Sequence, residues 1–141
     1  MNLFFLASSL RIAKSYDLTP EGELVKHSYP FVYEFTSTEA ATPTIQTFYD
    51  HVVKHAAQGH CLLKGALTRP LSSESRAGST VPNERTDWIC LDLDGVEGYQ
   101  SVDLFLEDIG LGSTDYILQW SSSQGIENKS GFRCHIFMLL E

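Results

Sequence analysis

The chain has 141 residues and is 43% hydrophobic and 11% aromatic, which is enough apolar content for a buried core and excludes a wholly disordered protein. Its 10 Lys and Arg residues against 18 Asp and Glu residues give a net charge of −8, which excludes a protein held on nucleic acid by general attraction. No apolar run approaches the roughly 18 residues of a membrane helix. Three cysteines without metal-type spacing predict a reducing, cytoplasmic environment.

The first part of the chain predicts two strands and a helix. Residues 2–6 are apolar and residues 28–35 are aromatic and β-branched, so each is expected to form a strand. A helix should follow, because Thr42 suits an N-cap, Pro43 suits the first turn, and apolar residues then recur at helical spacing. Gly59 should end this helix.

A strand is expected next over residues 60–67, and a polar stretch over 68–86 follows it. The stretch is too long for an ordinary connection. It fits either a solvated loop or a loop that closes over phosphates or a nucleic-acid strand. Four of the ten cations lie in or just before this stretch: Lys64, Arg69, Arg76 and Arg85.

The second half of the chain predicts a short helix over 102–109 and strands over 88–94, 116–120 and 132–140. Strands alternating with a few helices favour an α/β or an α+β fold, and we expect the α+β fold. We expect a mixed sheet with flanking helices, in a single domain over residues 1–141. Because the sequence stops directly after an apolar strand, we also expect it to be a truncated piece of a longer chain.

The sharpest feature is a pair of carboxylates at the end of a strand, in the sequence WICLDLDG. Residues two apart share a face of a strand, so Asp92 and Asp94 project together while the leucines beside them point into a core. Adjacent carboxylates repel each other unless a cation lies between them, and Mg²⁺ and Mn²⁺ are the ions that such oxygen ligands hold. The alternative is a solvated strand end before the turn at Gly95.

A second group of polar residues precedes and begins the last expected strand. Arg133 and His135 share one face of that strand. Small residues and hydroxyls before it suit a phosphate: Ser121, Ser122, Ser123, Gly125, Asn128, Ser130 and Gly131. The alternative for His135 is a hydrogen-bonded core histidine. His51 and His55 are expected to be surface residues, and the three cysteines are expected to lie in the core.

The order of these motifs resembles the archaeo-eukaryotic primase superfamily, especially the primase-polymerases of phages and plasmids. The first family motif is an apolar strand ending in Asp-x-Asp, which is ICLDLDG here, and the second is a Ser/Gly turn leading into a histidine strand, which is SSSQGIENKSGFRCHIF here. The strand HCLLKGAL and the arginine-containing segment up to Arg85 are also similar to phage members. The resemblance covers roughly residues 59–140.

The resemblance implies template-directed nucleotidyl transfer with two divalent metal ions, Mg²⁺ or Mn²⁺. Asp92 and Asp94 would be metal ligands, and His135 would contact the phosphates of the incoming nucleotide. The residues expected to help bind the nucleotide are Arg133, Ser130, Ser123, Lys64 and Arg85. The implied fold is an RNA-recognition-motif-like sheet beside an N-terminal α/β unit.

The resemblance also implies partners and a location. The partners are a single-stranded DNA template and nucleoside triphosphates, with a helicase as a further candidate, and the location is the cytoplasm of a bacterial host cell. The family carries a third metal-binding carboxylate on a later strand, and Glu141 lies too close to His135 to be that residue. We therefore expect little or no catalysis from these 141 residues alone.

Two other functions fit parts of the same pattern. In a haloacid-dehalogenase-type phosphatase, Asp92 would be the nucleophile and Asp94 the acid/base. That motif normally opens its domain, however, and would leave the histidine strand unexplained. The second alternative is a non-catalytic nucleotide-binding or nucleic-acid-binding module of a replication protein.

Overall fold

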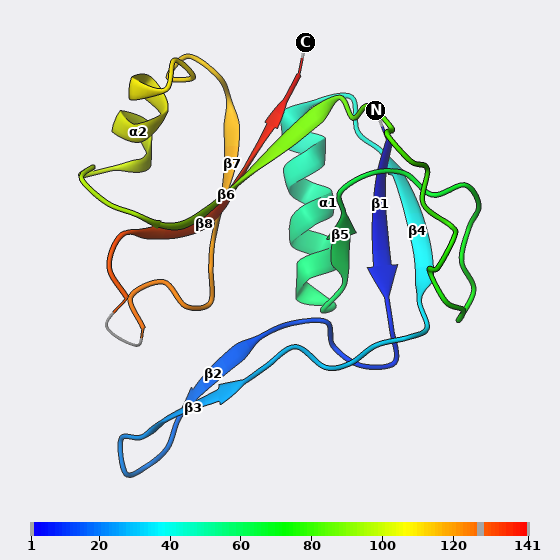
Figure 1. Ribbon diagram of the computed structural model, residues 1–141, viewed down its shortest axis with the longest axis horizontal. Coiled ribbons are helices and arrows are strands. Elements are labelled where there is room, and N and C mark those ends of the chain that lie inside the picture. The colour runs from blue at the N-terminus through cyan, green and yellow to red at the C-terminus, as the bar shows by residue number, and fades with distance from the viewer. Residues whose placement is uncertain (1, 127–128, 141) are drawn as a thin grey trace. The chain divides into compact units, whose positions relative to one another are not determined.

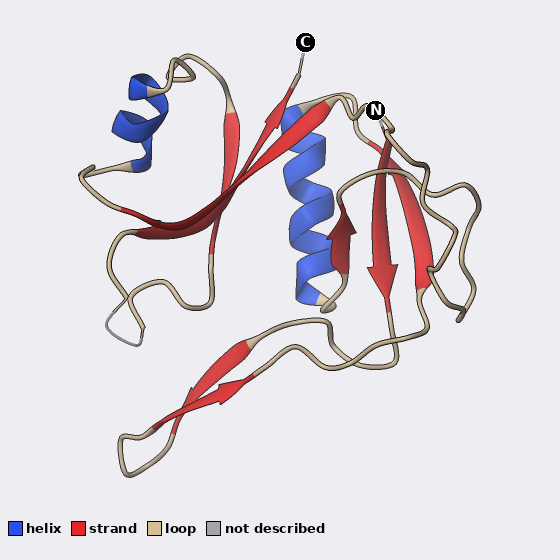
Figure 2. Ribbon diagram, viewed as in Figure 1, coloured by secondary structure: helices blue, strands red, loops and turns tan. Residues whose placement is uncertain are grey.

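The structure is a computed structural model that describes residues 2–126 and 129–140. The chain forms two compact units, Met1–Thr86 and Asp87–Glu141, and each unit is described by itself. That the chain is a single domain stays a prediction. The expected α+β fold is confirmed, with helices and small sheets in the described part of the chain (Figures 1 and 2). The sheets are not mixed as expected, because each strand pair among the described residues is antiparallel.

The first unit contains a three-stranded sheet of order β4-β1-β5, a helix and a separate hairpin of β2 and β3 (Figure 1). Its elements are β1 (Asn2–Ala7), β2 (Ser15–Leu18), β3 (Leu24–His27), β4 (Thr36–Ala41), α1 (Ile45–Ala57) and β5 (Cys61–Leu63). Alternation along β1 gives the sheet two apolar faces. Phe5 stacks on His55 of α1, with ring centroids 3.8 Å apart. Leu6 packs on the other face with Leu63, Leu67 and Leu71.

Three expectations for this unit were wrong in detail. Residues 28–34 form no strand, and only Phe35 makes an isolated bridge, to Glu74. Helix α1 is capped by Thr44 rather than Thr42, because the Thr44 hydroxyl accepts from the Thr47 N–H. The strand expected over 60–67 is only the three residues of β5, which the polar stretch follows.

The second unit has a three-stranded antiparallel sheet of order β6-β8-β7 with one helix. Its elements are β6 (Trp88–Val96), α2 (Val102–Asp108), β7 (Tyr116–Trp120) and β8 (Phe132–Leu139). The sequence predicted each of these elements, and the observed bounds differ by no more than two residues. Helix α2 begins at the N-cap Ser101, whose hydroxyl accepts from the Leu104 N–H. Neither described helix is both long and apolar enough to pass through a membrane.

Helix α2 covers one face of this sheet. The buried residues of that contact are Val102, Leu106, Cys134, Ile136 and Met138. Tyr116 of β7 also donates a hydrogen bond to Asp103 of α2, with an O···O distance of 2.6 Å. That hydrogen bond, with some burial, raises the pKa of Tyr116 to about 12. Since alternate residues of β8 point into this core, the residues between them lie on the opposite face.

Candidate functional site

The face of the second sheet opposite α2 gathers the predicted site residues of β6 and β8. In the antiparallel register, Asp92 lies directly across from His135 and Asp94 directly across from Arg133. Asp92 Oδ1 is 3.4 Å from His135 Nε2, and Asp94 forms an ion pair with the Arg133 guanidinium. The prediction that Asp92, Asp94 and His135 share one face is confirmed, whereas their functional roles stay predictions.

The His135 ring is oriented by a neighbour on the third strand. Gln119 of β7 is the Cα partner of His135, and its Oε1 lies 3.2 Å from His135 Nδ1. Because an amide oxygen only accepts, Nδ1–H is the donor in this contact. Nε2 is then the ring atom that faces Asp92. Sequence reasoning missed Gln119, whose one sign was a polar side chain within an otherwise apolar strand.

Arg133 is fixed at both its backbone and its side chain. Its N–H donates to Gln124 Oε1 at 2.6 Å, and its carbonyl accepts from the Ser121 N–H at 2.8 Å. Its side chain is only 18% exposed, and the buried Nε has no hydrogen-bond partner in the described part of the chain. We expected this arginine to contact phosphate, and the structure pairs it with Asp94. Gln124 was not anticipated, since only the folded loop brings it to the strand.

Two glycines allow the ends of β6 and β8 to approach closely at this site. Gly131 has φ +76°, and a Cβ there would lie 2.6 Å from the carbonyl oxygen of Val96. Gly95 has φ +89°, and a Cβ there would lie 3.3 Å from an Arg133 guanidinium nitrogen. The strand register is irregular between Asp94 and Val96. The glycines therefore allow the bulge beside Asp94 and leave room for Arg133.

The serine loop differs from the expected phosphate-binding loop. Ser123 is 3% exposed, and its hydroxyl lies 3.0 Å from that of Ser121, so it faces the protein rather than a ligand. Ser130 is exposed and donates to the Glu97 carboxylate, a negative neighbour that disfavours a phosphate. Asn128 of the same loop and Glu141 lie outside the described residues.

Lys64 and Arg85 were the other residues predicted to bind the nucleotide. Lys64 directly follows β5, and Arg85 lies in the segment at the end of the first unit. Both are exposed. Their contact with phosphates stays a prediction.

The donor set fits a hard cation only in part. The side chains of Asp92 and Asp94 are 63% and 79% exposed, and carboxylate oxygens are the ligands that Mg²⁺ and Mn²⁺ prefer. No three His, Cys, Asp or Glu side chains gather into a metal-binding group within residues 2–126 and 129–140. Cys134 is 1% exposed and packs in the core under α2, so its thiol lies on the opposite face of the sheet from Asp92 and His135. The two carboxylates would need water or substrate oxygens to complete a shell.

In comparisons with known proteins, no family model, no curated protein and no solved structure matches this chain.

Proposed function

We propose that the polar end of β6 and β8, on the face opposite α2, is a metal-dependent nucleotidyl-transfer site of the primase-polymerase type. The observation that carries the proposal is the alternation of charge across two paired strands, with Asp92 opposite His135 and Asp94 opposite Arg133. An antiparallel sheet with a helix packed on one face and polar groups on the other is also compatible with an RNA-recognition-motif-like core. A nucleoside triphosphate and a single-stranded template are the proposed substrates.

In this proposal Asp92 and Asp94 hold the Mg²⁺ or Mn²⁺. A metal ion bound there would neutralise phosphate charge and stabilise the attacking and leaving oxygens. His135 Nε2 faces the same side as Asp92, so its protonated form donates to a phosphate oxygen of the nucleotide. Arg133 now pairs with Asp94. When that carboxylate turns to a metal ion, the guanidinium becomes available to a phosphate, for which its forked geometry is suited.

The decisive experiment measures nucleotide binding with and without metal. Calorimetric titration of a deoxynucleoside triphosphate should give binding with Mn²⁺ and little or none with chelator. Asp92→Asn should weaken that binding about tenfold or more, because it removes a charged ligand while keeping the side-chain shape. Asp115→Asn is the matched control, since Asp115 is an exposed aspartate of the same unit that lies outside the three strands.

Two results would separate the alternatives. Triphosphate binding that is indifferent to both metal and Asp92→Asn would contradict the proposal and favour a non-catalytic binding module. Hydrolysis of p-nitrophenyl phosphate that requires Asp92 would instead favour the phosphatase. Template-dependent incorporation of labelled nucleotides, lost in Asp92→Asn and kept in Asp115→Asn, would support the proposal directly.

A further inference from the structure

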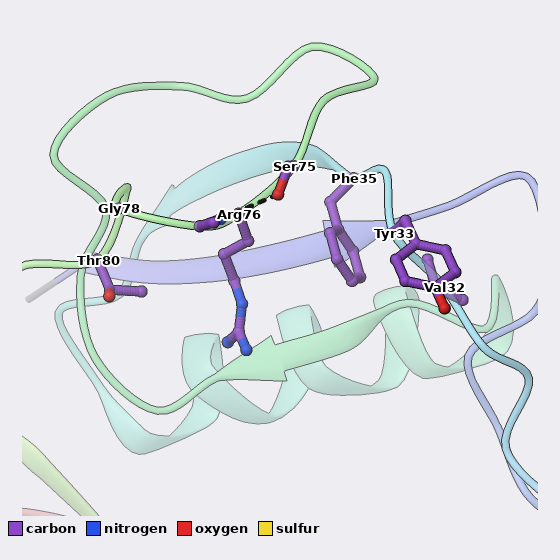
Figure 3. Close-up of a pocket in the computed structure, with 8 residues that line it drawn as sticks. Val32, Tyr33, Phe35, Ser75, Arg76, Gly78 and Thr80 are labelled. Carbon is purple, nitrogen blue, oxygen red and sulfur yellow. Dashed lines mark hydrogen bonds between the residues drawn. The ribbon is translucent and has the colours of Figure 1, made fainter.

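The first unit contains a second candidate binding site, a pocket of about 410 Å³ (Figure 3). This volume falls within the range of about 300–1,000 Å³ that is usual for ligand pockets. The pocket lies between the segment before β4 and the long polar stretch that follows β5. Its lining residues are Val32, Tyr33, Phe35, Ser75, Arg76, Ala77, Gly78 and Thr80.

Arg76 places an unneutralised cation in this pocket. Its guanidinium forms no hydrogen bond or ion pair with any residue that the structure describes. The nearby carboxylate of Glu74 is already taken, because Arg69 Nη1 lies 2.6 Å from Glu74 Oε1. Burial raises the pKa of the Cys61 thiol, and the Arg76 charge acts in the opposite direction, which places the guanidinium within electrostatic reach of β5. Figure 3 likewise shows the Arg76 side chain extending from the loop toward that strand.

Aromatic rings form the other wall of the pocket. Phe35 is fixed, because it packs against the core cluster of Leu6 and its backbone pairs with Glu74. Tyr33 is 78% exposed, and its ring lies beyond Phe35 as seen from Arg76 (Figure 3). The ring faces of Tyr33 are therefore available to a flat ligand, while the hydroxyls of Ser75 and Thr80 supply polar groups nearby.

We propose that this pocket binds one nucleotide of a single-stranded nucleic acid, with a base stacked on Tyr33 and a phosphate held by Arg76. Single-strand sites combine cations that follow the backbone with aromatic side chains that take unstacked bases, and this pocket offers one of each. The net charge of −8 opposes binding by the molecule as a whole, so a local site of this kind is what strand binding requires. Calling the bound strand a template rests on the proposed function, whereas strand binding itself does not.

The test is fluorescence anisotropy of a labelled oligothymidylate of about 16 nucleotides, titrated with the whole chain in chelator. Arg76→Ala should weaken binding about tenfold and reduce the slope of log K against log salt by about 0.7, because one phosphate contact is lost. Tyr33→Ala should weaken binding about tenfold without changing that slope, since stacking releases no counterion. Tyr33→Phe should retain the affinity, and Arg76→Lys should retain the slope.

Matched controls come from the helix on the other face of the same sheet. Lys54→Ala and Tyr49→Ala each remove an exposed side chain of the same kind from α1, and neither should change strand binding. The proposal is overturned if the Arg76 and Tyr33 variants bind like the unmodified chain. It is also overturned if the control variants lose as much affinity for the strand as the Arg76 and Tyr33 variants, or if a duplex of the same length binds equally well.

A negative result in the strand-binding assay can be told apart from a negative result in the triphosphate assay. Strand binding is measured in chelator and needs no metal, whereas the triphosphate assay of the proposed function contains no strand. Absence of metal-dependent triphosphate binding would therefore contradict only the proposed function. Strand binding that does not depend on Arg76 and Tyr33 would contradict only this inference, whereas absence of all strand binding would also contradict the single-stranded template of the proposed function.

Discussion

Gly131 is the residue at which the start of β8 meets the end of β6 most closely. A Cβ there would lie 2.6 Å from Val96 O and 2.7 Å from the Gly95 carbonyl carbon, and both contacts are with backbone that has no side-chain freedom to yield. We expect Gly131→Ala to lower the free energy of unfolding by about 2–4 kcal/mol, from left-handed backbone strain and steric overlap together. Urea denaturation followed by circular dichroism measures this loss.

Gly125 provides the control for this substitution. It has φ +69° in the same loop, but a Cβ there would meet nothing within 4 Å. Gly125→Ala should therefore cost only the backbone strain, about 1 kcal/mol. Equal losses for the two variants would show that the close approach to β6 does not contribute.

At the scale of single residues, the sequence predicted the part of the site that depends on strand parity. Asp92, Asp94 and His135 could be assigned to faces because side chains alternate with a period of two along any strand. The pairing of Asp92 with His135 depends on the register between two distant strands, which the sequence does not specify. Gln119 and Gln124 could not be anticipated for the same reason, because each acts through a cross-strand or loop contact.

Helix α1 contacts the sheet through a histidine that we expected at the surface. His55 is 5% exposed, it stacks on Phe5, and its Nδ1 lies 2.9 Å from His60 Nδ1. Burial lowers the pKa of His55, and the neighbouring His60, Lys54 and His51 lower it further. The apolar periodicity of the helix was correct, but it gave no sign that a polar ring would occupy a buried position.

This burial makes the first unit sensitive to acid. Because the pKa of His55 is lower in the folded state than its ordinary 6.5, the unfolded chain binds the proton more readily below that pH. The contribution of neutral, buried His55 to the free energy of unfolding is fully present above pH 6.5 and should fall as the pH drops below that value. His55→Phe keeps a stacking ring and removes the proton site, so the change in denaturation midpoint between pH 7.5 and 5.5 should shrink.

His55→Phe should also lower the free energy of unfolding at neutral pH, and His51 of the same helix provides a control. At pH 7.5, His55→Phe should lose about 1 kcal/mol, because the hydrogen bond with His60 disappears. His51→Gln changes another histidine of the same helix and should leave most of the acid sensitivity in place, because burial, the largest cause of the lowered pKa of His55, is unchanged. An unchanged pH dependence in His55→Phe would assign the effect to a different group.

At the scale of elements, burial decided which segments the sequence could predict. Strands β7 and β8 are mostly apolar, because one face packs on α2 and Ile117 and Phe137 are buried on the other, and both were expected nearly at their observed bounds. Strand β4 has only Ala40 buried, and the strands of the β2–β3 hairpin bury no residue. The sequences of these strands therefore show no regular alternation of apolar and polar residues. The aromatic residues over 28–34 predicted a strand that does not form, because a segment with high strand propensity still needs a neighbouring strand to pair with.

At the scale of the whole molecule, an acidic chain carries a local cluster of cations and an exposed apolar segment. The net charge is −8 and the isoelectric point is near 5.0. The exposed apolar side chains of the β2–β3 hairpin and the segment after it include Leu18 at 72% and Phe31 at 89% exposure. Such groups favour association between molecules, and like charge at neutral pH opposes it.

This balance predicts self-association when the charge is removed. Lowering the pH from 8 toward about 5 should increase light scattering at a fixed protein concentration, because the net charge approaches zero near the isoelectric point. Phe31→Ser should reduce the scattering, whereas Val53→Ser, which changes an exposed residue of α1, should not.

A second series at pH 8 with rising salt separates charge removal from acid unfolding. Acid also acts on His55, whereas salt at pH 8 screens the net charge while that histidine stays neutral. Association that appears only in the acid series, or that Val53→Ser reduces as much as Phe31→Ser, would show that acid unfolding rather than the exposed segment drives it.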